Sequence, residues 1–303
     1  MNRYRVSQLK LNIGEDIKDI SAKIIHLYGK NSRDEKMKVF DIKIVRHSID
    51  ARKKNNIHHV YTLDFSTNIR LKLPEPEDYL YKEIRVDKYL ESPPVIVGFG
   101  PCGMFAALIL AEAGYRPIVI ERGSAIEDRV YKVERFWTKG ILDTECNVQF
   151  GEGGAGTFSD GKLTSGIKDP RKRKVLESFV RFGANPEIMY EQKPHIGTDV
   201  LRGIVKNLRN RIIELGGKVL FDTKLEEVEI SEGRVSGAVV RHGNERDLIK
   251  TSNLIIAIGH SARDTFSMLN DIGLEMEQKP FSIGVRIEHP QNVIDEGQYG
   301  EFA

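Results

Sequence analysis

Cysteine and long apolar runs are scarce in this sequence. Cys102 and Cys146 are the two cysteines among 303 residues, and their separation excludes a Cys-x-x-Cys redox motif and a cysteine-only zinc site. Such low cysteine content suits a reducing compartment. The longest apolar stretches are less than half as long as a bilayer span requires, and the first residues carry no secretory signal. We therefore expect a soluble, cytoplasmic protein with no membrane partner and no metal site.

An excess of charge of one sign is also missing. The chain has 46 lysines and arginines against 44 aspartates and glutamates, a formal net charge of +2. This balance implies neither strong electrostatic steering of nucleic acid nor an acidic tail. A basic stretch at 46–56 is interpreted as a solvated loop, because nearby acids dilute its charge. We expect a small-molecule substrate and no nucleic-acid partner, and the oligomeric state is left open.

The strongest signal is a glycine-rich turn between an apolar strand and an apolar helix. The apolar residues 95–97 run into Gly98-Phe-Gly100-Pro-Cys-Gly103, and a second apolar strand ends at Glu121. This is the Gly-x-Gly-x-x-Gly turn in its full strand–helix–strand context. Gly98 permits the tight turn, Gly100 lets the backbone approach a pyrophosphate, and Gly103 lets the helix pack on the strand. The pattern predicts a dinucleotide at the helix N-terminus, with Glu121 accepting ribose hydroxyls.

A second glycine-rich segment runs from Phe150 to Lys162. Its glycine density is incompatible with a helix interior or a strand. The interspersed Glu, Thr, Phe, Asp and Lys favour a shaped loop over a flexible linker, with backbone N–H groups directed at a ligand. Glu152, Asp160 and Lys162 either orient a substrate or hold this loop in place.

The pattern along the chain predicts four segments. These are a small α+β domain at 1–72, a proline-containing linker at 73–94, a nucleotide-binding domain at 95–265 with a helical insertion at about 165–215, and an incomplete further domain at 266–303. Within the third segment, a buried strand at 218–222 precedes three short strands between 225 and 251, which are typical of an antiparallel meander. A buried strand then ends at Gly259.

This order resembles the FAD-binding domain of the glutathione-reductase superfamily. A classical nicotinamide dehydrogenase would continue with alternating strands and helices instead of a meander. The turn at Gly98, the segment Glu121-Arg-Gly, the glycine-rich segment and Lys193-Pro-His195-Ile-Gly-Thr-Asp199 are similar to those of uncharacterised bacterial FAD-dependent dehydrogenases, also called NAD(FAD)-utilising dehydrogenases. The similarity spans essentially the whole chain.

The resemblance implies an α/β fold of the Rossmann-like FAD/NAD(P)-binding type with a β-meander crossover. It implies bound FAD and hydride or electron-pair transfer with an unidentified organic substrate, and NADH or NADPH could serve as a transient donor. A Gly-Asp motif that superfamily members carry near their C-terminus is missing, and the segment 281–289 looks like the first strand of a substrate domain. We therefore expect a truncated substrate domain and a chain that is a fragment.

The residues expected to contact the cofactor lie in the turn, at strand ends and in the glycine-rich segment. They are Gly98, Gly100, Pro101, Cys102, Gly103, Glu121, Arg122, Arg129, Gly151, Gly153, Gly154, Ala155, Gly156, Thr157, Leu225 and Gly259. Arg122 and Arg129 either reach cofactor phosphates or are solvated on a helix surface. Leu225 belongs to the backbone that flanks the adenine in the superfamily.

No catalytic residue is assigned from the sequence. His195 and His260 are read as structural histidines in preference to acid–base groups. Cys102 is read as a small residue required by the turn, the alternative being a reactive thiol at a helix N-terminus. Two other functions stay open: an FAD-dependent RNA-modifying enzyme whose basic N-terminal domain docks the RNA, and a non-catalytic flavin-binding module.

Overall fold

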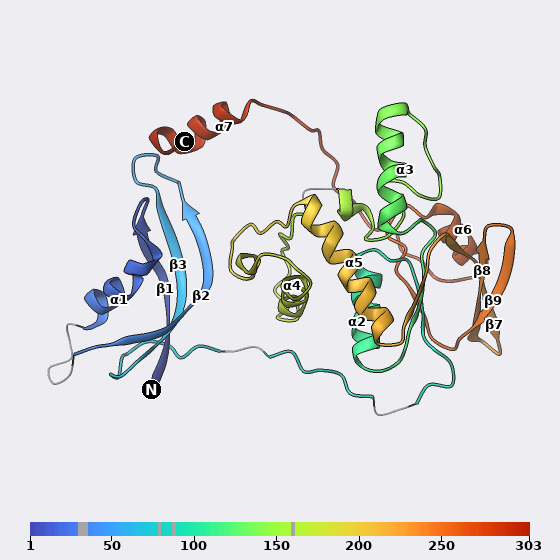
Figure 1. Cartoon of the computed structure of the whole chain (residues 1–303), viewed down its shortest axis with the longest axis horizontal. Coiled ribbons are helices and arrows are strands. Elements are labelled where there is room, and N and C mark those ends of the chain that lie inside the picture. Colours follow the sequence, from blue (N-terminus) through green and yellow to red (C-terminus); the bar gives the residue numbers. More distant parts are fainter. Residues whose placement is uncertain (30–35, 78–79, 87–88, 159–160) are drawn as a thin grey trace. The chain divides into compact units, whose positions relative to one another are not determined.

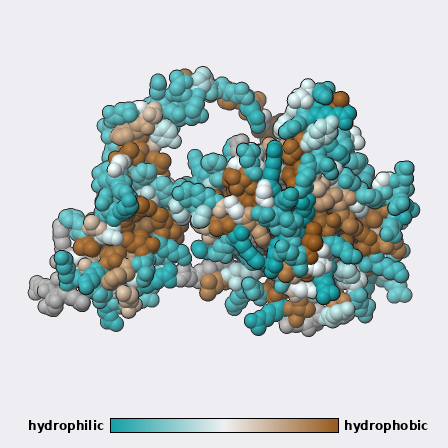
Figure 2. Space-filling view, in the orientation of Figure 1, coloured by the Kyte–Doolittle hydropathy of each residue, from teal (hydrophilic) through white to brown (hydrophobic). Residues whose placement is uncertain are grey.

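The computed structural model describes residues 1–303 except 30–35, 78–79, 87–88 and 159–160 (Figure 1). The chain divides into two compact units. The first unit comprises Met1–Leu80, Pro186–Pro194 and Pro280–Ala303, and the second comprises Tyr81–Asn185 and His195–Lys279. In the view of Figure 2, hydrophilic residues cover most of the surface, and apolar residues appear in patches. Among the described residues, no helix is long and apolar enough to cross a membrane.

The first unit is built on an antiparallel sheet of β1 (Asn2–Asn12), β3 (His58–Thr67) and β2 (Val39–Asp50), with β3 in the centre. A single 3₁₀ turn, η1 (Ile17–Asp19), leads into α1 (Ile20–Tyr28), and the strand residues Tyr61, Leu63 and Phe65 form a core with the helix. Because side chains alternate along a strand, the even-numbered residues of β3 face away from this core. Further elements of the unit are η4 (Pro186–Met189), α7 (Gln291–Tyr299) and η5 (Gly300–Phe302).

The second unit contains a parallel sheet in the order β10-β4-β5-β6. Its strands are β4 (Val95–Val97), β5 (Ile118–Ile120), β6 (Lys218–Leu220) and β10 (Leu254–Ile256). Its helices are α2 (Pro101–Glu112), α3 (Ile126–Lys139), α4 (Lys172–Arg181), α5 (Thr198–Glu214) and α6 (Arg263–Asp271), and η3 (Ala155–Phe158) is one 3₁₀ turn. The chain therefore has a mixed α/β fold with a parallel sheet.

An antiparallel meander follows β6 in the chain. It consists of β7 (Thr223–Ser231), β8 (Arg234–His242) and β9 (Glu245–Lys250), paired in that order. Leu225, Val228, Ala238 and Val240 of the meander share one hydrophobic core with the sheet residues Val95, Val97 and Ile120. The meander thus has a buried face and a solvated one, as its alternating sequence pattern requires.

The segment expected as an incomplete further domain at 266–303 begins inside α6. This helix spans Arg263–Asp271, packs against β7, and buries Leu269 in the same core as the sheet. Residues 266–271 therefore complete the hydrophobic core of the second unit.

The basic stretch at 46–56, expected as a solvated loop, is strand as far as Asp50. The antiparallel register of β2 continues until Asp50 lies opposite His58. The backbone hydrogen bonds of this pairing outweigh the local polarity of the sequence. The prediction of a loop is therefore wrong for residues 46–50, which belong to β2, and agrees with the turn that follows Asp50.

Candidate functional site

A cavity of about 510 Å³ lies at the carboxyl-end edge of the parallel sheet in the second unit. Ends of parallel strands meet at one edge, and this edge is where open α/β sheets bind ligands. The lining residues come from strand ends, the start of α2, the glycine-rich loop, the start of β7 and the start of α6. They are Val97, Gly98, Gly100, Pro101, Cys102, Ile120, Glu121, Arg122, Gln149, Phe150, Gly151, Gly154, Ala155, Thr223, Leu225, Ile256, Ala257, Ile258, Gly259, His260, Ser261, Ala262, Thr265 and Phe266.

The turn from β4 into α2 requires its glycines for steric reasons. A Cβ on Gly103 would lie 1.9 Å from the carbonyl oxygen of Gly98, and Gly98 itself has a φ of +98°. Gly100 is the N-cap of α2 and supplies no capping side chain. By helix geometry, the first-turn N–H groups of Cys102 and Gly103 have no partner inside the helix. The turn therefore places the N–H of Cys102, which lines the cavity, and the positive end of the helix dipole beside it.

Glu121 is the buried acid at the end of β5, and its side chain is held by three backbone donors. One carboxylate oxygen accepts from the N–H groups of Gly123 and Gly151, both at 2.9 Å. The other accepts from the N–H of Phe99 at 2.7 Å. An ionised carboxylate offers about four acceptor positions, so about one position is left, and Glu121 is one of the residues that line the cavity.

The glycine-rich loop packs directly against the turn between β4 and α2. The N–H of Gly153 donates to the carbonyl of Phe99 at 2.9 Å, and the N–H of Glu152 donates to the carbonyl of Ser124 at 3.1 Å. A Cβ on Gly154 would lie 3.0 Å from the Cα of Gly100. This backbone-to-backbone contact explains the glycine density, because side chains there would separate the loop from the turn.

Arg129 is fully buried on α3 and holds the loop by its carbonyl groups. Its guanidinium donates to the carbonyls of Asn147 at 3.1 Å, Val148 at 3.1 Å and Gly151 at 3.3 Å, and also to that of Glu152. Burial lowers the pKa of Arg129 to about 10, although nearby Glu121, Cys146 and Glu152 favour the charged form. The side chain of Arg129 thus stabilises the loop through its backbone carbonyls, and Arg129 is not among the residues that line the cavity.

Glu152 is the second buried charged group of the loop. One of its oxygens accepts from the N–H of Ile126, the first residue of α3, at 2.7 Å, and from Arg209 of α5 at 2.8 Å. Its other oxygen is buried with no hydrogen-bond partner among the described residues. Burial raises the pKa of Glu152, and the hydrogen bond from Ile126 and the charge of Arg209 oppose this shift. Of the two sequence-based alternatives, the contacts seen are those of a residue that holds the loop.

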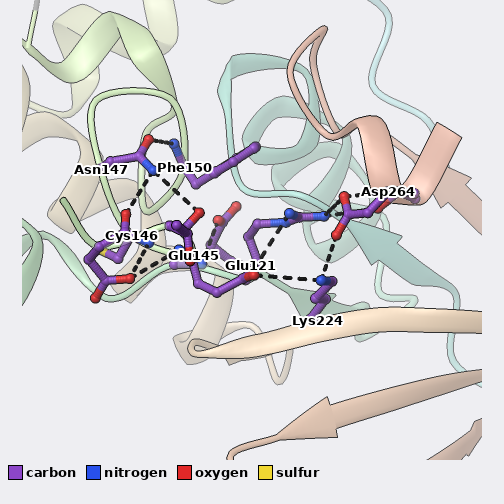
Figure 3. A network of polar contacts seen from close by, with 12 residues as sticks. Glu121, Glu145, Cys146, Asn147, Phe150, Lys224 and Asp264 are labelled. Carbon is purple, nitrogen blue, oxygen red and sulfur yellow. Dashed lines mark hydrogen bonds and ion pairs between the residues drawn. The ribbon is translucent and has the colours of Figure 1, made fainter. Parts of the chain in front are cut away.

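A network of ion pairs lies beside Glu121, and Arg122 joins it to the cavity wall (Figure 3). Arg122 donates to Asp264 at 2.8 Å, lies 3.6 Å from Glu145, and stacks its guanidinium 4.5 Å from the centroid of the Phe150 ring. Lys224 of β7 contacts the same two acids. Partial burial opposes ionisation of Asp264, but hydrogen bonds from Arg122, Lys224 and the Thr265 backbone outweigh it and hold the pKa of Asp264 far below its usual range.

Eleven of the sixteen residues expected at the cofactor line the cavity, and five do not. The five are Gly103, Arg129, Gly153, Gly156 and Thr157, which lie beneath the turn or within the loop. Arg129 is neither a solvated surface residue nor directed at the cavity. Arg122 lines the cavity, but its hydrogen-bonding groups contact Asp264 and Thr265.

Other candidates have mixed outcomes. His260 lines the cavity and bonds to Ser261, whereas His195 forms an isolated bridge with Lys162 and is not a lining residue. Cys102 lines the cavity and is exposed. Asp160 lies outside the described residues. No group of three His, Cys, Asp or Glu side chains that could hold a metal occurs in the described part of the chain.

Several lining residues carried no sequence signal. They are Gln149, Ser261, Ala262, Thr265 and Phe266. Gln149 and Ser261 are joined by a hydrogen bond of 3.2 Å across the cavity, from segments 112 residues apart. For the wall formed by Ser261, Ala262, Thr265 and Phe266, the sequence offered one indication: the apolar run into Gly259 predicted that a strand ends nearby.

Comparisons with known proteins give a partial context. Residues 3–66 match a domain family of unknown function, DUF8436. An uncharacterised protein of Clostridium beijerinckii is 44% identical over 310 residues, which cover 98% of this chain and 56% of that protein. A thiamine thiazole synthase of Thermotoga maritima is 28% identical over 213 residues, covering 65% of this chain and 71% of that enzyme.

Among solved structures, Thermovibrio ammonificans THI4 matches with a TM-score of 0.41 and 19% identity, over 61% of this chain and 64% of that one. The chain spans about half the length of the Clostridium beijerinckii relative.

Proposed function

We propose that the second unit binds FAD and that the protein is an FAD-dependent oxidoreductase. It would transfer a hydride or an electron pair between an organic small molecule and the flavin, in the cytoplasm. The observation that carries the proposal is Glu121. Its carboxylate is fixed by three backbone donors, retains about one further acceptor position, and belongs to a residue that lines the cavity together with the first residues of α2.

The residues of the cavity fit an adenosine diphosphate group. The free acceptor position of Glu121 suits a ribose hydroxyl, and its charge disfavours a 2′-phosphate. The first turn of α2 suits the pyrophosphate, and a Cβ on Gly100 would have its nearest neighbour at 3.8 Å, so the backbone there is open to a ligand. Leu225, Ile256 and Ile258 supply apolar walls for aromatic rings.

When bound, FAD supplies the two-electron chemistry, and the protein supplies position and electrostatics. Glu121 would accept a hydrogen bond from the ribose and so help to orient it. The backbone of Gly151 and Gly154 lines the cavity without side chains, so the ligand can approach the loop closely. Arg129 and Glu152 keep this loop in one shape. NADH or NADPH would act as a transient donor, since the described part of the chain shows one dinucleotide turn.

The comparisons support the proposal only in outline. The relative from Thermotoga maritima is named a thiamine thiazole synthase, which is not the name of an oxidoreductase. The chain spans about half of the longer Clostridium beijerinckii relative. The activity, substrate and partners of the whole protein are therefore part of the proposal.

The test is the visible absorption spectrum of the purified chain, before and after addition of FAD, with the heat-released cofactor identified by chromatography. We expect a yellow protein that releases FAD. Glu121→Gln should lose most of the flavin, and Glu91→Gln, which changes an exposed acid of the same unit, should retain it. A chain that is colourless and takes up no FAD, together with a colourless Clostridium beijerinckii relative, would overturn the proposal.

Reduction of the bound flavin tests the enzymatic half. The flavin band should bleach when NADH or NADPH is added without oxygen, and a substrate screen can then follow the return of the band. A flavin that no donor reduces would favour the alternative of a non-catalytic flavin-binding module.

A further inference from the structure

A second cavity lies in the first unit, at the end of the sheet where β2 turns into β3. It has a volume of about 440 Å³ and is lined by Lys10, Asp50, Arg52, Lys53, Asn56 and His58. In the sheet register, His58 stands opposite Asn12 of β1 and Asp50 of β2. As an even-numbered residue of β3, His58 is on the face away from α1. All six residues fall within the part of the chain that matches the domain of unknown function.

His58 is a buried side chain with an unused nitrogen. The residue is 6% exposed, and its Nδ1 lies 3.1 Å from the carbonyl oxygen of Asn56. A carbonyl accepts only, so Nδ1 carries a hydrogen, and in the tautomer that has its one hydrogen on Nδ1 the other nitrogen, Nε2, is an acceptor. Nε2 is buried and has no hydrogen-bond partner among the described residues. Such a group requires a donor from outside the chain.

The neighbour of this nitrogen is a second acceptor. The carboxylate of Asp50 lies 3.6 Å from Nε2, which is beyond hydrogen-bond distance. Arg52 occupies the carboxylate from its outer side, at 2.8 and 2.6 Å. Two acceptors at this separation can share the single hydrogen of one ligand hydroxyl as a three-centre hydrogen bond, with the hydroxyl oxygen lying beside the pair.

The rest of the cavity wall is positively charged. Lys10 and Lys53 line the cavity, and neither ammonium makes an ion pair within the described residues, while Arg52 neutralises Asp50. This charge excludes a metal cation and favours an anion. Inorganic phosphate would satisfy the lysines, but its single P–OH group would have to serve His58 and Asp50 from the same small ion, whereas a sugar phosphate carries separate hydroxyl donors beside its phosphate.

We propose that this cavity binds a sugar phosphate. The phosphate accepts from Lys10 and Lys53, and a sugar hydroxyl donates to Nε2 of His58 and to Asp50. The site is independent of the flavin proposal, because all of its residues belong to the first unit. The same chemistry occurs in a free sugar phosphate and in the ribose–phosphate backbone of RNA, where the 2′-hydroxyl is the donor.

The experiment titrates the whole chain with ribose 5-phosphate and follows the histidine ring signals by NMR and the heat by calorimetry. We expect ribose 5-phosphate to bind about tenfold more tightly than either inorganic phosphate or ribose, and to move the signals of His58. Lys53→Gln, an exposed change that leaves the fold intact, should weaken binding about tenfold. The matched control Lys38→Gln, at the opposite end of β3 beside Asn68, should leave it unchanged.

His58→Phe keeps the ring and removes both nitrogens, so it should abolish the preference for ribose 5-phosphate over inorganic phosphate. If this variant fails to fold, Lys10→Gln and Lys53→Gln still decide the matter. Absence of binding up to about 10 mM, or binding that Lys53→Gln leaves unchanged, overturns the proposal.

Two oligonucleotides of one sequence identify the source of the sugar phosphate. Tighter binding of single-stranded RNA than of DNA, sensitive to Lys53→Gln, supports the RNA backbone. Binding of ribose 5-phosphate without a preference for RNA supports a free sugar phosphate. Equal binding of RNA and DNA through Lys53, with no response to ribose 5-phosphate, overturns the role of the hydroxyl.

Discussion

Replacement of Arg129 by methionine should destabilise the protein by removing the support of the glycine-rich loop. The guanidinium donates to four loop carbonyls. Two of these keep another donor, since Gly151 accepts the N–H of Gly154 and Glu152 accepts the hydroxyl of Thr157.

The carbonyls of Asn147 and Val148 lose the one donor that the described residues give them. At about 1–2 kcal/mol for each unsatisfied group, the free energy of unfolding should fall by about 2–4 kcal/mol. Methionine fills much of the arginine volume, so loss of packing adds little.

Urea unfolding followed by circular dichroism measures this loss. Arg135→Met changes an exposed arginine of the same helix, and its free energy of unfolding should stay within about 0.5 kcal/mol of the parent. Arg129→Lys keeps the positive charge but has fewer hydrogen-bond donors, so its free energy of unfolding should lie between those of Arg129→Met and the parent. FAD uptake should weaken in Arg129→Met and not in Arg135→Met. Equal stability of the two methionine variants would refute the reasoning.

Three further changes test the cavity and its surroundings. Gly103→Ala places a Cβ 1.9 Å from a backbone oxygen and should lower the free energy of unfolding by about 1–3 kcal/mol. A Cβ added at Gly156 would meet no atom within 4 Å, so Gly156→Ala should leave the free energy of unfolding nearly unchanged. Glu121→Gln should weaken FAD binding about tenfold in a fluorescence titration. A hydrogen bond from Arg209 lowers the pKa of Glu127 from 4.5 to about 2, so its stabilising effect exists above pH 4.5 and disappears as the pH falls toward 2. Urea midpoints of Glu127→Gln and the parent should therefore differ at about pH 6 and converge in acid.

Each of these expectations has a contrary outcome. Similar melting temperatures for Gly103→Ala and Gly156→Ala would show that α2 is not packed as closely on the turn as described. Unchanged FAD affinity in Glu121→Gln would remove the main support for the flavin proposal. A midpoint difference for Glu127→Gln that persists in acid would contradict an origin in the carboxylate charge.

Local sequence patterns predicted the secondary structure of the second unit well. The apolar run at 95–97 is a buried parallel strand, and the expected meander is present as β7, β8 and β9. The runs at 254–258 and 218–222 also form parallel strands, but these end at Ile256 and Leu220, and they are half-buried and largely exposed, respectively, instead of buried. The boundary expected at 265 falls inside α6, a helix that is placed by packing of Leu269 against strands distant in sequence. Short apolar segments and glycine turns depend on the conformation of a few neighbouring residues, so they can be recognised in a single sequence.

The sequence by itself determined the turn around Gly98 and the acid at Glu121, because steric exclusion at glycine and the end of a strand are local properties. The tertiary structure alone decided the roles of the charged side chains. Arg129, which the sequence left as either a phosphate ligand or a solvated residue, is a buried support for the loop. Arg122 contacts Asp264, 142 residues away. A long charged side chain takes the partner that the folded chain brings within about 3 Å, and sequence spacing does not encode that distance.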